Sequence, residues 1–586
     1  MKNKIKTGLL AILIGGLGVF VSCADLLKVD SDSYLNTEDN RLDSPNDSVY
    51  SVVGILKMFR ELGDRYFLLG ELRGDLMAVT ENADMNMQAI ANFTATADNP
   101  YLSTREFYAV INNCNYFLQQ VDTNIVAAGR KVMLGEYSVV KAIRAWTYMQ
   151  LVLNCGKAVY LNEPILTIDD MNKDYPIMSP PQLIETLLTD MLDYIDEAIY
   201  PSYGGINRKL FVSGPMVAGE LLLWMGAYTG NPAYYERAAE IYYRYIYDNR
   251  YLRGGGNYCN RYVDSNFEEI LTAYAWNAIF YEDEEKISQI LYSVNPSEVL
   301  NYPSIMRLTY PEITGNEIFQ YMVKPSQAAM DLWGNETYTH YNQTTRELFY
   351  TKGDLRGLCN RGAYDPLGSY YYADQEGTLP CIAKFGYIIQ LSGSYSFNNY
   401  MPEITLYRAG KMYLRYAEAL NGLGKPSLAF AVLKYGLRNE ILSDSTKINP
   451  DELDPLPAYC DFTNSRFSID GGATPQSGMH TRGSGFADQD TLYYAFTEET
   501  LLVNSAYYGF PDHLASKQDS IRFVDAMICK ELGLETAFEG NRFHDLMRFS
   551  IRSGGEEFLA KWVGRRDPAL TTVLMNRDNW YLPVPD

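Results

Sequence analysis

Two segments of the chain each predict a pair of helices that pack against one another. Residues 219–246 and 411–440 both contain two stretches with helical apolar periodicity, separated by a turn with Gly and Pro. In each segment a small residue recurs after twelve positions: Gly226 before Ala238, and Ala417 before Ala429. Small residues at this spacing let two antiparallel helices approach closely. We therefore expect stacked α-hairpins as the scaffold of the fold.

Two further segments predict helices with different degrees of burial. Residues 180–199 place apolar side chains on one face and acids mostly elsewhere, and Ser179 with Gln182 has the pattern of a capping box. We expect this helix on the surface. Residues 139–153 are apolar nearly all round, so that helix should be packed on most sides.

The fold class predicted by these patterns is dominated by α-helices. The twelve-residue spacing is typical of tetratricopeptide repeats, although any helix pair packed through small residues would show it. Residues 249–399 and 442–520 are rich in Gly, Pro, Asn, Asp and Tyr, which predicts long irregular loops with minor β-strands such as 289–294. Loops of this length in a compact protein are usually functional. We expect them to build a ligand-binding face on a scaffold of tetratricopeptide-like helical hairpins.

The charge balance excludes nucleic acid as a partner. The chain has 50 Lys and Arg against 72 Asp and Glu, a net charge of -22, which is the wrong sign for neutralising phosphates. Its 49 tyrosines outnumber the 24 phenylalanines and 6 tryptophans. Tyrosine offers a flat apolar ring together with a hydroxyl, and surfaces rich in tyrosine tend to bind polar ligands.

The first 23 residues have the pattern of an export signal. Three lysines precede a fifteen-residue uncharged stretch, which is shorter than the ~20 residues of a membrane-spanning helix, so we favour a cleaved signal over a transmembrane anchor. Ser22 followed by Cys23 resembles the lipobox of bacterial lipoproteins, although Phe20 stands where Leu, Val or Ile is usual. The resemblance implies a signal peptide over residues 1–22, acylation at Cys23 and a tether over residues 23–50.

The sequence predicts neither a metal site nor a cofactor. Four histidines are far apart, and the closest two of the seven cysteines beyond Cys23 are 22 positions apart, so no metal-binding spacing occurs. The motifs HExxH, GxSxG, GxxxxGK[ST] and GxGxxG are missing. Zinc proteases, α/β-hydrolases, P-loop NTPases and dinucleotide enzymes are therefore disfavoured.

The densest group of charged residues lies within residues 531–549. On a helix, Asp545 is three residues from both Arg542 and Arg548, so its carboxylate can lie between two guanidinium groups. Together with Glu539 the group could form an acid/base centre or a partly buried ion-pair cluster that determines how helices pack. We favour the structural cluster, because arginine does not transfer protons in proteins.

Residues 535–548 resemble the C-terminal signature of the SusD/RagB family of Bacteroidetes outer-membrane lipoproteins, whose pattern runs approximately ELxFEGxRxxDLxR. Thr536 replaces the usual Leu and Asn541 the common His. The residues that match are Glu535, Phe538, Glu539, Gly540, Arg542, Asp545, Leu546 and Arg548. Further segments follow the family order and begin at Arg105, Gly135, Lys324, Gly353, Leu406 and Tyr581.

This resemblance implies one α-rich unit, residues 23–586, with four tetratricopeptide-like helix pairs on one side and an irregular ligand-binding face on the other. Residues 51–248 would form an N-terminal helical region and residues 249–586 a C-terminal region with the loop-rich face. The resemblance further implies a protein that is not an enzyme and needs no cofactor. Such a protein captures oligosaccharides and acts as a lid on a SusC-like TonB-dependent β-barrel that imports them. It would be held in outer-membrane lipid by acylated Cys23, and Asp25, Asp30 and Asp32 resemble the acidic signal for export to the cell surface.

Candidate ligand contacts lie in two loop regions. The first precedes the helix expected from Arg105, where family members commonly place ligand contacts, and the second is the central loop region. The first region supplies Asn82, Asp84, Asn86, Phe93 and Tyr101, and the second supplies Tyr302, Tyr310 and Tyr321. For each tyrosine the alternative is ordinary packing with a satisfied hydroxyl.

Three alternative functions stay open at this point. A RagB-like protein of the same architecture would bind peptides. A helical glycoside hydrolase would use two of the 72 carboxylates, although the sequence singles out no pair. A purely structural module would bind the barrel and no small ligand, but the long Tyr-rich loops argue against it.

Overall fold

The computed structural model describes residues 45–127, 129–204, 206–249, 260–263, 269–272, 285–292, 304–309, 320–342, 347–354, 356–357, 359–360, 368–369, 380, 382, 384, 387–391, 394–398, 403–462, 478–484 and 515–584. The predicted signal peptide, Cys23 and most of the predicted tether lie outside these residues. So do large parts of the two predicted loop regions, including Tyr302 and Tyr310.

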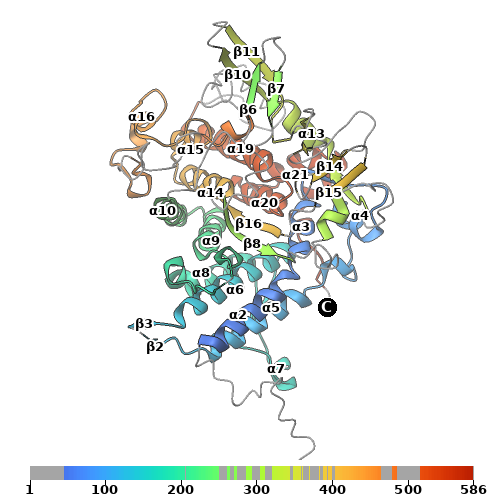
Figure 1. Ribbon diagram of the computed structural model, residues 1–586, viewed down its shortest axis with the longest axis vertical. Coiled ribbons are helices and arrows are strands. Elements are labelled where there is room, and N and C mark those ends of the chain that lie inside the picture. Colours follow the sequence, from blue (N-terminus) through green and yellow to red (C-terminus); the bar gives the residue numbers. More distant parts are fainter. Residues whose placement is uncertain are drawn as a thin grey trace, which may run out of the picture.

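Helices that are neighbours in the chain pack side by side and form most of the described structure (Figure 1). The first half contains α2 (Pro45–Arg60), α5 (Arg105–Gln120), α6 (Leu134–Cys155), α8 (Pro180–Met191), α9 (Gly214–Thr229) and α10 (Pro232–Asp248). The second half contains α14 (Ala409–Gly422), α15 (Pro426–Lys434), α19 (Lys517–Thr536), α20 (Arg542–Ser553), α21 (Glu557–Gly564) and α22 (Ala569–Leu574). Helix α10 packs against α14 and thereby joins the two halves. The predicted α-dominated class and both predicted hairpins, α9 with α10 and α14 with α15, are confirmed.

One tyrosine ring explains why small residues are needed where the hairpins meet. Tyr235 of α10 lies against Gly226 of α9 and Gly422 of α14. A Cβ atom added at Gly226 would come within 2.6 Å of this ring, and one added at Gly422 within 2.3 Å. Both distances are far below van der Waals contact, so only glycine allows the three helices to close around the ring.

Helix α6 is buried along almost its whole length, as its apolar sequence predicts. The ring of Trp146 meets those of Phe59 and Tyr66 edge to face, with centroids 5.0 and 5.2 Å apart. Aromatic pairs in this geometry add about 0.5–1.5 kcal/mol to the burial of their surface. This cluster fixes α2 and α3 (Gly63–Glu71) against the centre of the fold.

Helix α8 begins as predicted but ends earlier. Gln182 Oε1 accepts hydrogen bonds from the backbone N–H of Ser179 at 3.0 Å and from its hydroxyl at 2.8 Å. The α-helix stops at Met191, and the chain continues in two 3-10 turns, Leu192–Tyr194 and Glu197–Ile199. The predicted end at residue 199 is wrong because Asp196 is extended and its side chain caps the second turn through Ala198 N.

The strands are short and pair in twos. Two antiparallel pairs are β1 (Met77–Val79) with β9 (Val323–Pro325) and β8 (Lys286–Leu291) with β16 (Glu403–Arg408). The strand predicted over residues 289–294 overlaps β8 over residues 289–291; β8 begins three residues earlier, at Lys286, and residues 293–294 lie outside the described residues. Further pairs, β6 (Asn260–Val263) with β7 (Glu269–Thr272) and β10 (Thr337–Asn342) with β11 (Glu347–Lys352), lie at the upper end of Figure 1, beyond α19.

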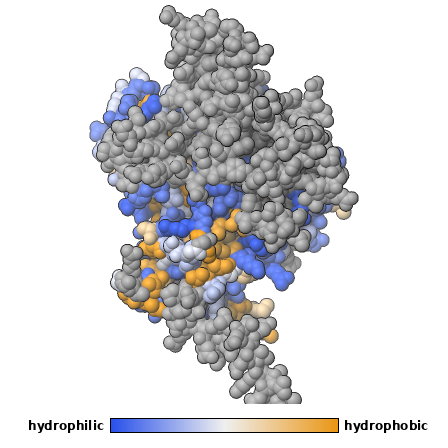
Figure 2. Space-filling model, in the orientation of Figure 1, coloured by the Kyte–Doolittle hydropathy of each residue, from blue (hydrophilic) through white to orange (hydrophobic). Residues whose placement is uncertain are grey.

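The helical half of the molecule presents apolar side chains on its surface. Figure 2 shows hydrophobic surface gathered in the lower half of the view, where Figure 1 places the helices of the first 200 residues. Exposed large side chains in this part include Val126, Leu166, Ile168, Met171 and Ile177. Within the described part of the chain, one helical stretch, Arg208–Thr229, is long and apolar enough to span a membrane. Because 89% of its apolar window is buried in the fold, it is a core helix.

Candidate functional site

A two-stranded sheet brings together two of the candidate segments. Strand β1 ends next to the loop that begins at Thr80, and β9 follows directly on Tyr321 and Met322. Thr80 donates its backbone N–H to the carbonyl of Met322 at 2.9 Å and its hydroxyl to the carbonyl of Tyr321. The side-chain amide of Asn82 donates to the carbonyl of Gln320 at 3.3 Å. The loop after β1 and the segment before β9 therefore form one surface, although about 240 positions separate them.

Asp84 and Tyr101 hold the loop after β1 in shape. Asp84 caps α4 (Met85–Ala91) by accepting the N–H of Met87 at 2.8 Å, and its second carboxylate oxygen accepts the Tyr101 hydroxyl at 2.7 Å. Burial raises the pKa of Tyr101, and the hydrogen bond to Asp84 raises it further, so this phenol stays protonated. Asn82 and Asn86 are exposed beside this pair. The described surface therefore presents amides and a hydrogen-bonded carboxylate–phenol pair to a ligand.

Phe93 connects the same loop to the helical core. Its backbone lies in the left-handed region, at φ 58°, and its half-buried ring is 5.8 Å from the ring of Phe543 in α20. A bulky residue rarely adopts this conformation, so the contacts around it must hold it there. The guanidinium of Arg566 adds three hydrogen bonds, to the carbonyls of Leu72, Met77 and Ala91. The loop is thus fixed on the fold rather than standing free.

Tyr321 lies in the candidate surface but points inward. Its side chain is 4% exposed and its hydroxyl donates to the carbonyl of Pro380 at 2.5 Å. Its φ of 45° is also left-handed. This burial argues against a direct ligand contact and favours the packing role that the sequence left open. Asn82, Asp84, Asn86, Phe93 and Tyr101 remain the accessible candidates within the described residues.

The Phe-Glu-Gly part of the C-terminal signature is a backbone turn that encloses a carboxylate. Phe538 and Gly540 have φ angles of 64° and 83°, which turn the backbone N–H groups inward. The carboxylate of Glu71 accepts the N–H groups of Phe538, Gly540, Asn541 and Arg542 at 2.8–3.3 Å. Burial raises the pKa of Glu71 to about 7, and the backbone hydrogen bonds act in the opposite direction. The turn therefore joins α20 to α3, which is about 470 positions earlier in the chain.

The charged residues of the signature are paired, but with partners that the sequence analysis did not name. Asp545 does lie between two guanidinium groups, those of Arg548 and Arg415. Arg542 instead binds Asp75 through two hydrogen bonds, at 2.6 and 2.9 Å. The expected pairing of Arg542 with Asp545 is wrong, because Arg542 in the first turn of α20 is directed at the segment after α3.

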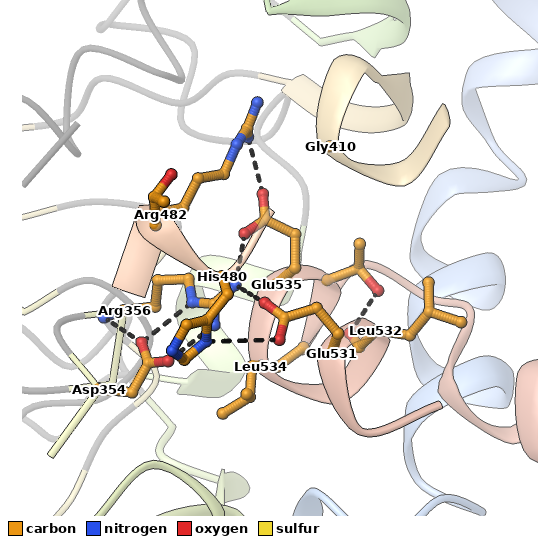
Figure 3. Close-up of polar contacts among 12 residues, drawn as sticks. Asp354, Arg356, Gly410, His480, Arg482, Glu531, Leu532, Leu534 and Glu535 are labelled. Carbon is orange, nitrogen blue, oxygen red and sulfur yellow. Dashed lines mark hydrogen bonds and ion pairs between the residues drawn. The ribbon is translucent and has the colours of Figure 1, made fainter. Parts of the chain in front are cut away.

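A larger network of buried charges surrounds Glu531 and Glu535 of α19 (Figure 3). Glu535 accepts hydrogen bonds from Arg356, Arg408 and Arg482 at 2.6–2.9 Å. Arg356 also binds Asp354 and Glu531, and all these side chains are at most 1% exposed. Burial alone would raise the pKa of Glu535, but the three arginines hold it well below its usual range. Gly410 completes the packing, since a Cβ there would come within 2.4 Å of the Glu535 carboxylate.

This network connects several described segments between residues 353 and 484 to one helix. Asp354 and Arg356, Lys384, and His480 with Arg482 come from separate segments between residues 353 and 484. Lys384 binds Glu539 and the carbonyl of Ala537, and His480 lies 3.9 Å from Glu531. Segments that are distant in sequence therefore meet at α19 and the turn that follows it.

The buried charges are poorly suited to acid/base catalysis. The carboxylates of Glu535, Glu539 and Asp545 are each paired with cations and inaccessible to a substrate. Glu336 has a pKa raised by burial to about 7, but its carboxylate is paired with Lys530. Within the part of the chain that the structure describes, no group of three or more His, Cys, Asp and Glu side chains is arranged to hold a metal ion. These arrangements favour the structural interpretation of the signature.

The partners Glu71, Asp75, Arg356, Arg408 and Arg415 were not predicted from the sequence. Each lies more than a hundred positions from the signature residue that it binds. Arg356, Arg408 and Arg415 lie in the segments beginning at Gly353 and Leu406 that follow the family order, and the local sign of Glu71 is a charge directly after the apolar run FLLG. A buried charge requires a partner, but the sequence does not say which.

Comparison with known proteins identifies the fold. No protein-family model matches the sequence, and no curated protein is significantly similar to it. A SusD homolog from Bacteroides thetaiotaomicron superimposes with a TM-score of 0.53 at 14% identity, over 95% of this chain and 93% of that one. A SusD superfamily protein from Bacteroides fragilis gives 0.53 at 15%, over 93% and 96%. Surface glycan-binding protein A from Bacteroides fluxus gives 0.52 at 12%, over 93% of both chains.

Proposed function

We propose that this chain, which has the fold of the SusD superfamily, is a nutrient-binding lipoprotein that captures glycans without cleaving them. Its place would be the surface of the outer membrane. The fold similarity extends over almost the whole chain, and one of the similar structures is a surface glycan-binding protein. The lipobox-like Ser22–Cys23 supports attachment to the membrane by acyl chains.

The single observation that carries the proposal is the surface built where β1 meets β9. Glycan sites combine aromatic rings, which lie on the apolar C–H faces of sugars, with amide and carboxylate groups that bind hydroxyls. Asn82, Asn86 and the Asp84–Tyr101 pair supply such groups on a loop that is fixed to the core. A fixed loop loses little conformational freedom when a ligand binds, which favours affinity.

Import would need a partner, and we propose a SusC-like TonB-dependent β-barrel on which this chain acts as a lid. The partner's coupling to TonB would supply the energy, so the lid itself requires neither a nucleotide nor a redox cofactor. A net charge of -22 argues against nucleic acid as a further partner.

The test is isothermal titration calorimetry of a soluble form, residues 24–586, against neutral oligosaccharides, acidic oligosaccharides and mixed peptides. Ligands recovered after titration are then checked for cleavage by mass spectrometry. We expect saturable binding of an intact glycan.

Each other outcome changes the proposal in a defined way. Binding of peptides alone would replace the glycan ligand by the RagB-like alternative. Cleaved saccharide would overturn the proposal that the protein is not an enzyme. Absence of binding across the whole panel would contradict capture of either ligand class.

A further inference from the structure

A pocket of about 1110 Å³ lies on a different side of the molecule from the candidate surface. It is bounded by the 3-10 turns Glu197–Ile199 and Arg208–Leu210, by α10 and by the start of β8. In Figure 1, α10 lies at the left of the molecule and α4, which carries the candidate surface, lies at the right. The volume is slightly larger than the roughly 300–1,000 Å³ that ligand pockets usually occupy.

The floor of this pocket is apolar and rigid. Tyr200, Phe211, Ile241, Tyr245 and Ile287 are all less than a tenth exposed. The rings of Tyr200 and Phe211 meet edge to face, 6.3 Å apart. The Tyr200 hydroxyl donates to the carbonyl of Val212 at 3.2 Å and accepts the N–H of Gly214 at 2.9 Å. The floor is therefore formed before any ligand arrives.

The rim of the pocket is charged but nearly neutral overall. It contains four cationic and three anionic side chains: Arg208, Lys209, Arg237 and Arg244, with Asp196, Glu240 and Asp248. Two further charged residues of the lining are committed to other partners, because Lys286 pairs with Glu403 and the Glu197 carboxylate is buried against Ser213 and Tyr245. On α10, Arg237 binds Glu240 at 2.8 Å and Arg244 binds Asp248 at 2.5 Å, and both pairs are exposed. Across the pocket, the Arg208 guanidinium donates to the carbonyl of Glu197. The rim thus offers many hydrogen-bond donors and acceptors but carries little net charge.

We infer that this pocket is a second saccharide-binding site, for a neutral oligosaccharide. Ile195 and Pro215, which line the pocket and are partly exposed above the buried floor, offer apolar contact to the C–H faces of sugar rings. The carboxylate and guanidinium groups of the rim suit the sugar hydroxyls. An anionic ligand would compete with the acids already paired on the rim, and a hydrocarbon ligand would leave the charged rim desolvated without partners. This inference rests on the proposed function and extends it from one site to two on separate sides of the chain.

The experiment uses a substitution that fills the pocket with a large side chain and does not remove any of the side chains that form it. Ala198 is exposed and lines the pocket, so Ala198→Trp should fill it without disturbing the floor. Ala233, exposed near the start of α10 and outside the pocket, gives the matched control Ala233→Trp. Both variants are checked by thermal unfolding and then titrated calorimetrically with neutral tri- and hexasaccharides of the malto-, cello-, xylo- and manno-series.

We expect two sites per chain for at least one trisaccharide, which is too short to bridge the two sides of the molecule. Ala198→Trp should weaken one of the two sites at least tenfold, and Ala233→Trp should leave both intact. A single site that Ala198→Trp does not affect would overturn this inference and leave the proposed function standing. Binding at the pocket of acidic saccharides alone would overturn the neutral ligand class. No binding of any saccharide would overturn both proposals.

Discussion

The carboxylate of Glu71 accepts the backbone N–H of Gly540 at 2.8 Å, and 469 positions separate these two residues. Glu71 ends α3 and Gly540 lies in the turn before α20, so this contact joins the beginning of the described chain to the signature near its end. Two glycines make this contact possible. Gly540 adopts a φ of 83°, and Gly70 has no side chain that would collide with the carbonyl oxygen of Gly540.

Glu71→Gln tests which effect determines the pKa of this carboxyl group in the folded protein: burial, which raises the pKa, or the backbone hydrogen bonds, which lower it. Burial raises its pKa from 4.5 to about 7, so the folded state binds a proton more tightly than the unfolded state does. The stabilisation from this proton is fully present below about pH 4.5 and is lost as the pH rises through about 7, an effect on the order of 3 kcal/mol. The free energy of unfolding of the wild type minus that of the variant should therefore fall across this window, measured by urea denaturation. A difference that grows with pH would mean that the four N–H groups stabilise the anion.

Gly70→Ala tests the close approach of α3 to the signature turn. A Cβ at position 70 would lie 1.8 Å from the carbonyl oxygen of Gly540, and both groups belong to rigid backbone. We expect a loss of about 3 kcal/mol or more in the free energy of unfolding, because overpacking here must move the backbone. Gly54→Ala in α2 is the control, since nothing lies within 4 Å of its Cβ. That change should be neutral or stabilise by up to about 1 kcal/mol through helix propensity. Equal effects of the two substitutions would contradict this account.

Arg356→Met tests whether the charge network anchors the loops to α19. Arg356 is fully buried and forms ion pairs with Asp354, Glu531 and Glu535. Without its guanidinium these three buried carboxylates would lose a positive charge that offsets their desolvation. Breaking a buried pair in this way costs about 3–5 kcal/mol. We also expect faster limited proteolysis between residues 353 and 484, where the anchored segments lie. Lys561→Met removes an exposed partner of Glu557 and should change stability by no more than about 1 kcal/mol. Unchanged proteolysis in Arg356→Met would rule out the anchoring role.

Replacing both Asn82 and Asn86 by Ala tests the candidate surface. Both side chains are exposed, and the hydrogen bond of the Asn82 amide to the carbonyl of Gln320 is a partly solvated one, so the fold should lose no more than about 1 kcal/mol of stability. Loss of one or two hydrogen bonds of about 1 kcal/mol each should weaken glycan affinity roughly 5- to 30-fold in calorimetry. The exposed Asn113 on α5 serves as the control, and Asn113→Ala should bind like the wild type. If the double variant keeps its affinity, the ligand binds elsewhere.

Cys23→Ala tests the lipoprotein prediction, which concerns residues outside those described. The thiol is the expected site of acylation, and two or more acyl chains are needed for stable anchoring. We expect the variant to lose metabolic labelling with palmitate and to leave the membrane fraction. Membrane attachment that persists in the variant would contradict the lipobox resemblance.

The elements that could be predicted correctly are those that depend on residues close together in the sequence. The hairpins α9–α10 and α14–α15 and the buried helix α6 follow from the spacing of apolar and small residues, because that spacing alone decides which face of a helix can be covered. The end of α8 was missed because Asp196 offers the backbone a competing hydrogen bond, which apolar periodicity does not register.

Which charged residues form ion pairs with one another depends on the tertiary structure. Asp545 and Arg548 pair within one helix, as their spacing predicts. Arg542, with the same spacing from Asp545, binds Asp75 instead because packing places the segment after α3 next to its guanidinium. Several pairings are chemically equivalent in the sequence, and only the packed backbone distinguishes them.

The α-helical scaffold and the signature motif can be predicted from the amino-acid sequence, because the residues that define them lie within about a dozen positions of one another. Three relations appear only in the folded chain: Glu71 closes the signature turn, Tyr321 faces inward, and the segments at Asn82 and Gln320 share one surface. These relations join residues hundreds of positions apart. Their free energies depend on distance and burial in space, and local sequence patterns do not encode either quantity.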